Sequence, residues 1–152
     1  MSQLIDFYRG QGRDSENRRI GDIWEWTDAD LEDVHDYIQW LFPLPEPSRF
    51  NPHAPLLTKD DIAAFRSDEL RRAAMRKSFD RILTFLGLTL AAGEVAESTN
   101  FSQRSPEVWD FPNHNWLRVT RILRSLTLAG LEPEAQALFA WLDQSYRRRR
   151  FP

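Results

Sequence analysis

The stretch "HDYIQWLFPLPEPS", residues 35–48, marks the point at which a predicted helix ends and a proline-rich segment begins. Upstream, Thr27 followed by Asp30 has the spacing of a capping box, and apolar residues then recur every three or four positions. This pattern predicts one amphipathic helix over residues 28–41. Pro43 ends it, because proline has no backbone N–H and clashes with the preceding turn.

Proline dominates the next segment, "PLPEPSRFNPHAP", residues 43–55, which holds five of the nine prolines and is called the proline strap below. Such a composition predicts an extended, rather rigid connector. Trp40, Phe42 and Phe50 are expected to pack against it and form a structural junction. On the predicted helix, however, Trp40 lies among the acidic residues, opposite the apolar stripe. The alternative is therefore that these rings form a groove for a foreign ligand.

Further helices are predicted wherever a capping residue precedes an apolar face. They run from Ser2 to Arg9, from Thr58 onward, from Asp68 to Leu86, from His114 to Ala129, and through a last helix that has Pro133 in its first turn. Leu70 and Tyr146 are assigned to the buried faces of their helices. Gly87 and Gly130 are expected to end the helices that precede them.

The remaining segments lack helical periodicity. Residues 10–21 are polar and predict a flexible loop, residues 88–112 predict a long loop or irregular helix, and residues 147–152 predict a frayed basic tail. The whole sequence, residues 1–152, therefore predicts an all-α, compact single domain, an orthogonal bundle of about five to six helices with a proline-rich strap.

Composition narrows the function classes. The chain has 152 residues, a mass of 17.9 kDa and no cysteine, which excludes disulfides, thiol nucleophiles and thiolate metal sites. No apolar run approaches the roughly 20 residues of a membrane-spanning helix, and the first ten residues do not resemble a signal peptide. A cytoplasmic location is expected.

Enzyme and metal motifs are not found. There is neither a G-x-S-x-G elbow nor a glycine-rich phosphate loop, so a non-enzymatic function is predicted. His35, His53 and His114 lack the spacing of helix-borne metal ligands. His35 and His114 are each expected to be a buried histidine whose nitrogens are tied to a backbone group or a carboxylate. Haem or another small cofactor with His35 or His114 as its axial ligand stays open as an alternative.

Charge is divided unevenly along the chain. Residues 1–65 contain 13 acidic and 6 basic residues, whereas residues 66–152 contain 10 acidic and 14 basic residues. Arg118, Arg121 and Arg124 repeat at three-residue intervals and predict a basic face on their helix. With a pI near 5.6, nucleic-acid binding is not expected. The preferred interpretation is an ion pair of Arg118 or Arg121 with an aspartate of the acidic helix, namely Asp28, Asp33 or Asp36.

Two long blocks carry a family resemblance. "HDYIQWLFPLPEPSRFNPHAPLLT" and "NHNWLRVTRILRSLTLAGLE", together with "IDFYRG" near the start, closely resemble the conserved region of the opioid growth factor receptor family. The resemblance covers nearly the whole chain and implies an all-helical module. A chain of this size looks like a stand-alone, minimal homologue, such as a bacterial one.

The resemblance also implies a function. In animals the family includes a receptor for the pentapeptide Met-enkephalin, which associates with the nuclear envelope and restrains cell proliferation, and which is unlike the seven-helix opioid receptors. The family gives no catalytic or peptide-contact residues to carry over, so the candidate site rests on the residues themselves.

The leading hypothesis is a ligand- or peptide-binding module in which the aromatic residues near the strap meet the basic face of the 114–129 helix. Rings and guanidinium groups together suit a short peptide with an aromatic residue and a free carboxylate. The candidate ligand-binding residues are His35, Tyr37, Trp40, Phe42, Phe50, His114, Arg118 and Arg121. A structural module that binds a protein partner is the remaining alternative.

Overall fold

A computed structural model describes residues 2–49 and 51–148. In these ranges the chain forms nine helices and one two-stranded hairpin, so the fold is mostly helical but not purely all-α. The predicted number of helices was too low, and a small sheet was missed. The element bounds are α1 Gln3–Tyr8, α2 Ile20–Trp24, α3 Asp28–Asp33, α4 Ile38–Leu41, α5 Lys59–Ser67, α6 Glu69–Leu86, β1 Leu88–Ala91, β2 Glu94–Glu97, α7 Phe101–Val108, α8 His114–Leu128 and α9 Glu132–Arg147.

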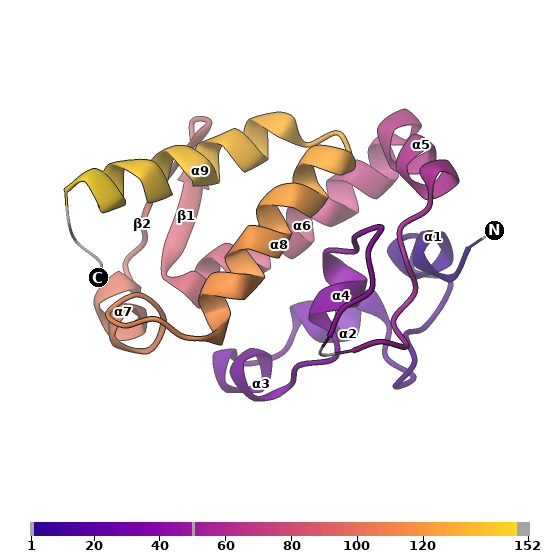
Figure 1. The fold of residues 1–152 in the computed structure, drawn as a ribbon, viewed down its shortest axis with the longest axis horizontal. Coiled ribbons are helices and arrows are strands. Elements are labelled where there is room, and N and C mark those ends of the chain that lie inside the picture. Colours follow the sequence, from indigo (N-terminus) through magenta and orange to yellow (C-terminus); the bar gives the residue numbers. More distant parts are fainter. Residues whose placement is uncertain (1, 50, 149–152) are drawn as a thin grey trace.

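The long helices α6 and α8 form the centre of the molecule (Figure 1). Helices α1, α2, α4 and α5 lie toward one end of the long axis, and α7, the hairpin and the end of α9 lie toward the other. Helix α3 lies near the middle, beside the start of α8. The guanidinium group of Arg118 on α8 lies 6.0 Å from the ring of Phe85 on α6, so the two central helices share one interior. The core is a single cluster of buried apolar residues.

The capping signals at Thr27, Thr58 and Asn113 are confirmed, whereas Ser67, a further cap candidate, ends α5 and Asp68 caps α6 instead. Thr27 and Thr58 each accept a hydrogen bond from the amide three residues on, and Asp30 and Asp61 complete the two capping boxes. Asn113 caps α8 through the amide of Asn115. These signals were readable because each depends on residues within one helical turn.

The single helix predicted over residues 28–41 is wrong. The chain leaves the helix at Val34, which is extended, and resumes it as the short helix α4. The break rotates the second half, so that Trp40, assigned to the acidic side, is only 2% exposed and packs 5.3 Å from the ring of Phe7. Side chains from elsewhere compensate for the lost helical hydrogen bonds: the hydroxyl of Tyr37 donates to the carbonyl of Leu31 at 2.6 Å, and Arg118 donates to the same carbonyl.

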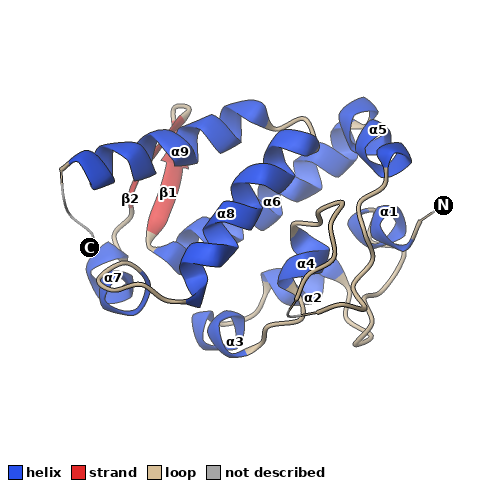
Figure 2. Cartoon of the chain, in the orientation of Figure 1, coloured by secondary structure: helices blue, strands red, loops and turns tan. Residues whose placement is uncertain are grey.

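The segment after α6 also differs from the prediction. Residues 88–97 form an antiparallel hairpin, shown in red in Figure 2, and β2 packs against α9. Ala92 and Gly93, both with positive φ, make its tight turn. Helix α7 follows in the stretch that was expected to be loop or irregular helix.

Two of the apolar assignments are wrong. Leu70 in the first turn of α6 is 78% exposed, and Tyr146 in the last turn of α9 is 72% exposed. Both lie at helix ends. There the helical spacing of apolar residues continues, but no neighbouring helix in the described ranges packs over that face to bury them.

The strap contains no helix or strand in its described part, as expected. It is fixed by polar contacts to α8: the hydroxyl of Ser125 donates to the carbonyl of Pro43 at 2.9 Å, and Arg124 pairs with Glu46 at 2.5 Å. Between Gly10 and Arg19 the chain forms an irregular loop in which Asp14 is buried, and its flexibility stays a prediction. Residues 149–152 of the predicted frayed tail lie outside the described residues.

None of the helices in the described ranges is both long enough and apolar enough to cross a lipid bilayer.

Alanine substitutions at Gly87 and Gly93 test how closely α7 approaches the end of α6. Gly87 has φ +81°, and a Cβ there would lie 3.0 Å from the Cα of Phe101, whereas Gly93 has φ +78° with open space around it. Gly93→Ala is expected to cost about 1 kcal/mol, from the positive φ alone. Gly87→Ala is expected to cost about 2–4 kcal/mol, because α7 must also shift. Urea unfolding of both variants measures the difference, and equal losses would contradict the close approach of α7.

Candidate functional site

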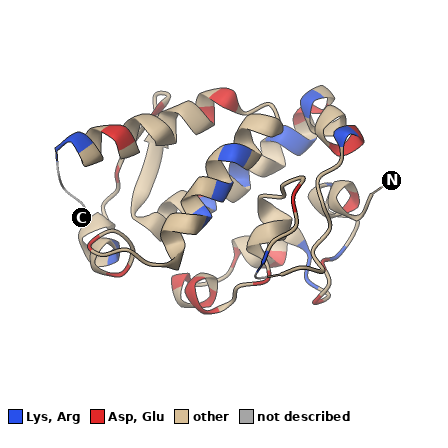
Figure 3. Ribbon diagram, in the orientation of Figure 1, with Lys and Arg blue, Asp and Glu red and all other residues tan. Residues whose placement is uncertain are grey.

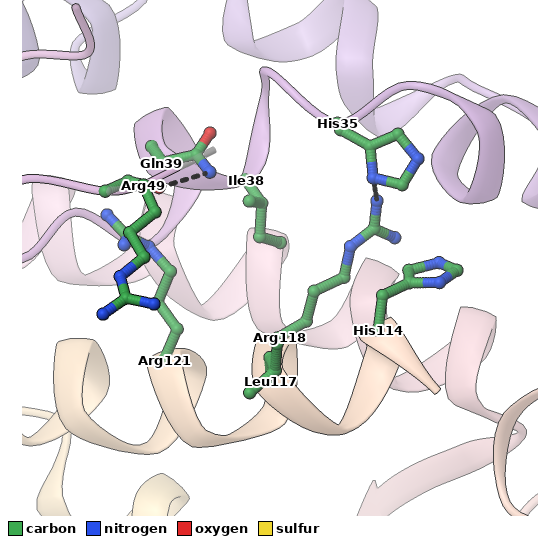
Figure 4. A pocket seen from close by; sticks show the side chains of 9 residues that line it. His35, Ile38, Gln39, Arg49, His114, Leu117, Arg118 and Arg121 are labelled. Carbon is green, nitrogen blue, oxygen red and sulfur yellow. Dashed lines mark hydrogen bonds between the residues drawn. The ribbon is translucent and has the colours of Figure 1, made fainter. Parts of the chain in front are cut away.

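A cleft of about 510 Å³ lies between α8 and the segment that runs from the end of α3 into the strap (Figure 4). This volume is typical of a site for a small molecule or a few peptide residues. Its lining residues are His35, Ile38, Gln39, Ser48, Arg49, His114, Leu117, Arg118 and Arg121. Ile38 and Leu117 supply apolar surface, and none of the lining residues is acidic.

The lining side chains fall into two groups. Figure 4 shows Gln39, Arg49 and Arg121 together at one end of the cleft, and the two histidines with Arg118 at the other. The two groups differ in how fully the protein already satisfies their polar atoms.

Arg118 has a structural role, because it is buried and its guanidinium donates to backbone carbonyls. It is 6% exposed, and its guanidinium donates to the carbonyls of Leu31 at 2.8 Å and Val34 at 3.0 Å. It also lies 5.4 Å from the ring of Tyr37. Because these contacts hold the broken end of α3, Arg118 joins that end to α8, and it also lines the cleft.

The predicted ion pair between Arg118 or Arg121 and an aspartate is wrong. Asp28 instead pairs with Arg81 at 3.0 Å, and Asp36 pairs with Arg18 at 2.9 Å. In the described part of the chain, neither Arg118 nor Arg121 forms an ion pair. The break after α3 displaces the aspartates, so that backbone carbonyls face α8 instead. Figure 3 shows the basic positions along α8 and the acidic positions gathered on α3.

Arg121 is a cation with unused hydrogen-bonding capacity. Its Nε donates to the carbonyl of Phe42 at 2.8 Å, and its two terminal nitrogens donate to no described residue. Burial lowers the pKa of Arg121 to about 10, an effect that the charge of Glu46 partly offsets. The guanidinium is still protonated at neutral pH, and it has been partly desolvated without gaining a paired carboxylate.

Arg49 lies at the same end of the cleft and is exposed. It forms no ion pair with any described residue. By contrast Arg124, the next arginine along α8, is engaged by Glu46. Arg121 and Arg49 are therefore the cations available to an anionic ligand.

The two histidines lie at the opposite end, with ring centroids 5.2 Å apart. Nδ1 of His35 is 3.4 Å from a terminal nitrogen of Arg118, and Nε2 of His114 is 3.2 Å from a carboxylate oxygen of Glu32. His114 is tied to a carboxylate, as expected, but the expectation that His35 and His114 are buried is wrong, because both are exposed. Desolvation lowers the pKa of His35, and the positive charges of Arg118 and His114 add to the shift.

This shift predicts a dependence of stability on pH. Because the folded protein holds a proton on His35 less tightly than the unfolded chain does, the free energy of unfolding is expected to fall as the pH decreases from about 7 to about 5. His35→Gln is expected to flatten this slope, whereas His53→Gln, at an exposed position on the strap, leaves it unchanged. Urea unfolding at several pH values measures both. A slope that His35→Gln does not change would contradict the assignment.

Three of the four predicted aromatic residues do not line the cleft. The side chains of Tyr37, Trp40 and Phe42 are almost completely buried in the core beneath it. Phe50 lies outside the described residues. Of the eight predicted ligand-binding residues, the structure brings His35, His114, Arg118 and Arg121 together at the cleft.

Sequence reasoning missed the other lining residues: Ile38, Gln39, Ser48, Arg49 and Leu117. One signal for them was available. Leu117 is an apolar residue on the basic, outward face of α8, and it is 60% exposed. Gln39 and Ser48 gave no signal, because their position depends on how the strap folds back.

The cofactor alternative stays a prediction. No group of three or more metal-ligating side chains is found in the described ranges. Among the described residues, Nδ1 of His35 faces Arg118 and Nε2 of His114 faces Glu32, which leaves the other ring nitrogen of each for a ligand. The absorption spectrum of the purified protein, before and after addition of haemin, tests haem binding directly.

Comparisons with known proteins identify a family. The conserved region of the opioid growth factor receptor (OGFr) matches residues 5–145. The human opioid growth factor receptor is 37% identical over 156 residues, which cover 97% of this chain and 23% of the human protein. The mouse receptor is 37% identical over 126 residues, covering 80% of this chain and 20% of its own length.

A second group of relatives is named receptor-like. Rat opioid growth factor receptor-like protein 1 is 36% identical over 111 residues, covering 72% of this chain and 23% of its own length. The chain thus spans less than a quarter of the length of these relatives. No solved structure matches it significantly. The match over residues 5–145 and the identity to the human receptor show that this chain belongs to the family of the opioid growth factor receptor conserved region.

Proposed function

We propose that this chain is a non-enzymatic binding domain, and that the cleft between α8 and the strap binds a short peptide through a carboxylate. The observation that carries the proposal is Arg121. Its guanidinium is partly desolvated, it has no paired carboxylate among the described residues, and its terminal nitrogens are free to donate. Such a group gains more from a bound anion than a fully hydrated surface arginine does.

The cleft also has apolar side chains beside the guanidinium of Arg121. Leu117 is mostly exposed, and Ile38 lies between the two polar ends of the cleft. A ligand with an apolar or aromatic group next to its carboxylate would cover Leu117 and Ile38 while it pairs with Arg121 and Arg49. This combination is found at the ends of short peptides.

The names of the relatives support a receptor function. The human protein is named opioid growth factor receptor, and the rat relative is named as receptor-like. We extend this to the present chain as a proposal of peptide binding without catalysis. We further propose a cytoplasmic location, in keeping with a cysteine-free chain, and no nucleic-acid partner.

Titration of Met-enkephalin and of its C-terminal amide tests the proposal. Arg121→Gln is expected to weaken binding of the free-carboxylate peptide by about 10-fold or more, because a charge-assisted hydrogen bond contributes about 1.5–3 kcal/mol. The amide is expected to bind the wild type about as weakly as the free peptide binds the variant. Isothermal titration calorimetry measures all of these affinities.

Arg124→Gln is the matched control. It removes the same charge one turn away, from an arginine that Glu46 already engages, so it is expected to change affinity less than about 3-fold. If both peptides fail to bind, or if they bind equally to the wild type and to Arg121→Gln, the carboxylate site is refuted.

A further inference from the structure

A second concave surface lies where α1, α2 and the first half of α6 meet. Its volume is about 720 Å³. We call it the α6 groove. It shares no lining residue with the cleft, so what it binds is independent of the function proposed above.

One wall of the groove is apolar. Leu70, Ala73 and Ala74 are spaced so that they share one face of α6, and Leu70 is the most exposed of the large apolar residues in the described chain, at 78%. Trp24 of α2 contributes a ring to the lining. This wall resembles the surface that one helix presents to another, with small residues beside a protruding leucine.

The charged groups of the groove are all basic. Arg9, Arg71 and Lys77 line it, and no acidic residue does. Arg71 is held by Asp68 at 2.7 Å. Lys77 stacks over the ring of Trp24 at 5.1 Å, and neither it nor Arg9 forms an ion pair with any described residue. Two cations therefore flank the apolar wall without anionic partners, on a chain whose formal charge is −3.

We propose that the α6 groove docks an acidic amphipathic helix of a partner protein. Apolar residues of the partner would cover Leu70, Ala73 and Ala74, and its carboxylates would pair with Lys77 and Arg9. Leu70 and Lys77 are seven residues apart, which is about 10 Å along α6, so a partner helix of two to three turns spans both. A concave site favours a helix over a membrane, because a flat lipid surface reaches the rim of a groove but not its floor.

The test uses a defined peptide probe. A synthetic helix of about four turns, with leucines along one face and glutamates flanking them, is titrated against the full chain by calorimetry. A scrambled peptide of the same composition and a peptide with lysine in place of glutamate are the peptide controls. The acidic helix is expected to bind at least 10-fold more tightly than either control.

Two variants locate the binding. Leu70→Glu and Lys77→Glu are each expected to weaken the acidic helix at least 10-fold, and Lys77→Glu is expected to improve binding of the lysine peptide. Phe139→Glu, at a similarly exposed apolar position on α9, is the matched control and leaves affinity unchanged. Because all three side chains are exposed, the variants are expected to fold.

Several results would overturn the proposal. It fails if the acidic helix binds no better than its scrambled form, or if binding persists in Leu70→Glu. It also fails if anionic phospholipid vesicles bind the chain through Leu70 and Lys77 while the acidic helix does not, since the groove would then be a membrane surface. None of these results bears on carboxylate binding at Arg121, which is measured with a different probe.

Discussion

Arg118→Ala is expected to lower the free energy of unfolding by about 3–5 kcal/mol, the largest effect expected for any single charged side chain here. The substitution removes the Arg118 donor from the carbonyl of Val34 and one of the two side-chain donors from the carbonyl of Leu31, which keeps the hydroxyl of Tyr37. It also opens a space beside the rings of Tyr37 and Phe85. A buried carbonyl that loses its partner costs about 1–3 kcal/mol, and the loss of the packed side chain adds to this. Urea unfolding followed by far-ultraviolet circular dichroism measures the loss.

Two further substitutions test whether the loss of stability comes from the hydrogen bonds of Arg118. Arg118→Lys keeps the charge but lacks the planar fork that reaches both carbonyls, so its loss is expected to lie between wild type and alanine. Arg124→Ala removes an exposed arginine from the same helix and is expected to cost less than about 1 kcal/mol. If Arg118→Ala costs no more than Arg124→Ala, Arg118 does not hold the break between α3 and α4.

Trp40→Ala is expected to cost about 3–5 kcal/mol, because the ring is buried against Phe7 and truncation leaves a large cavity. Its Nε1 donates no hydrogen bond to any described residue. Trp40→Phe is therefore expected to cost roughly half as much, since most of the ring contacts remain and no hydrogen bond is lost.

Trp109 provides the comparison. Its Nε1 donates to the carbonyl of Leu86 at 2.8 Å, so Trp109→Phe is expected to cost at least about 1 kcal/mol more than Trp40→Phe. Thermal and urea unfolding of both variants give the two losses. Peptide affinity is expected to be the same in Trp40→Phe and wild type. A folded Trp40→Phe variant that fails to bind would place the ring in the ligand site after all.

The sequence predicted those parts of the fold that depend on nearby residues. The caps at Thr27, Thr58 and Asn113 and the end of α6 at Gly87 follow from residue types within one turn, and all four are confirmed. The hairpin at residues 88–97 was missed because each strand has only four residues, too few for alternation to be recognised.

The break between α3 and α4 could not be predicted from local pattern. The apolar spacing through residues 28–41 fits a continuous helix, and the break is stabilised by Arg118, 84 positions beyond Val34 in the sequence. A long-range contact of this kind overrides local periodicity and moves Trp40 from the expected surface into the core.

The candidate site was predicted in position but only partly in composition. The expected meeting of the strap with the arginine face of α8 is confirmed by the contacts from Arg121 to Phe42 and from Ser125 to Pro43. The rings were also assigned to the ligand, because a continuous helix over residues 28–41 would place Trp40 on its acidic surface. Gln39 and Ser48 enter the cleft only through the path of the strap.

The most direct test of peptide binding at the cleft is a two-dimensional NMR titration of the chain with Met-enkephalin. We predict saturable shifts of the backbone amides of the cleft residues, centred on Arg121, Leu117, Gln39 and Arg49, and weaker shifts with the C-terminal amide. Saturable shifts confined to residues remote from the cleft, or no shifts at all, would contradict the account.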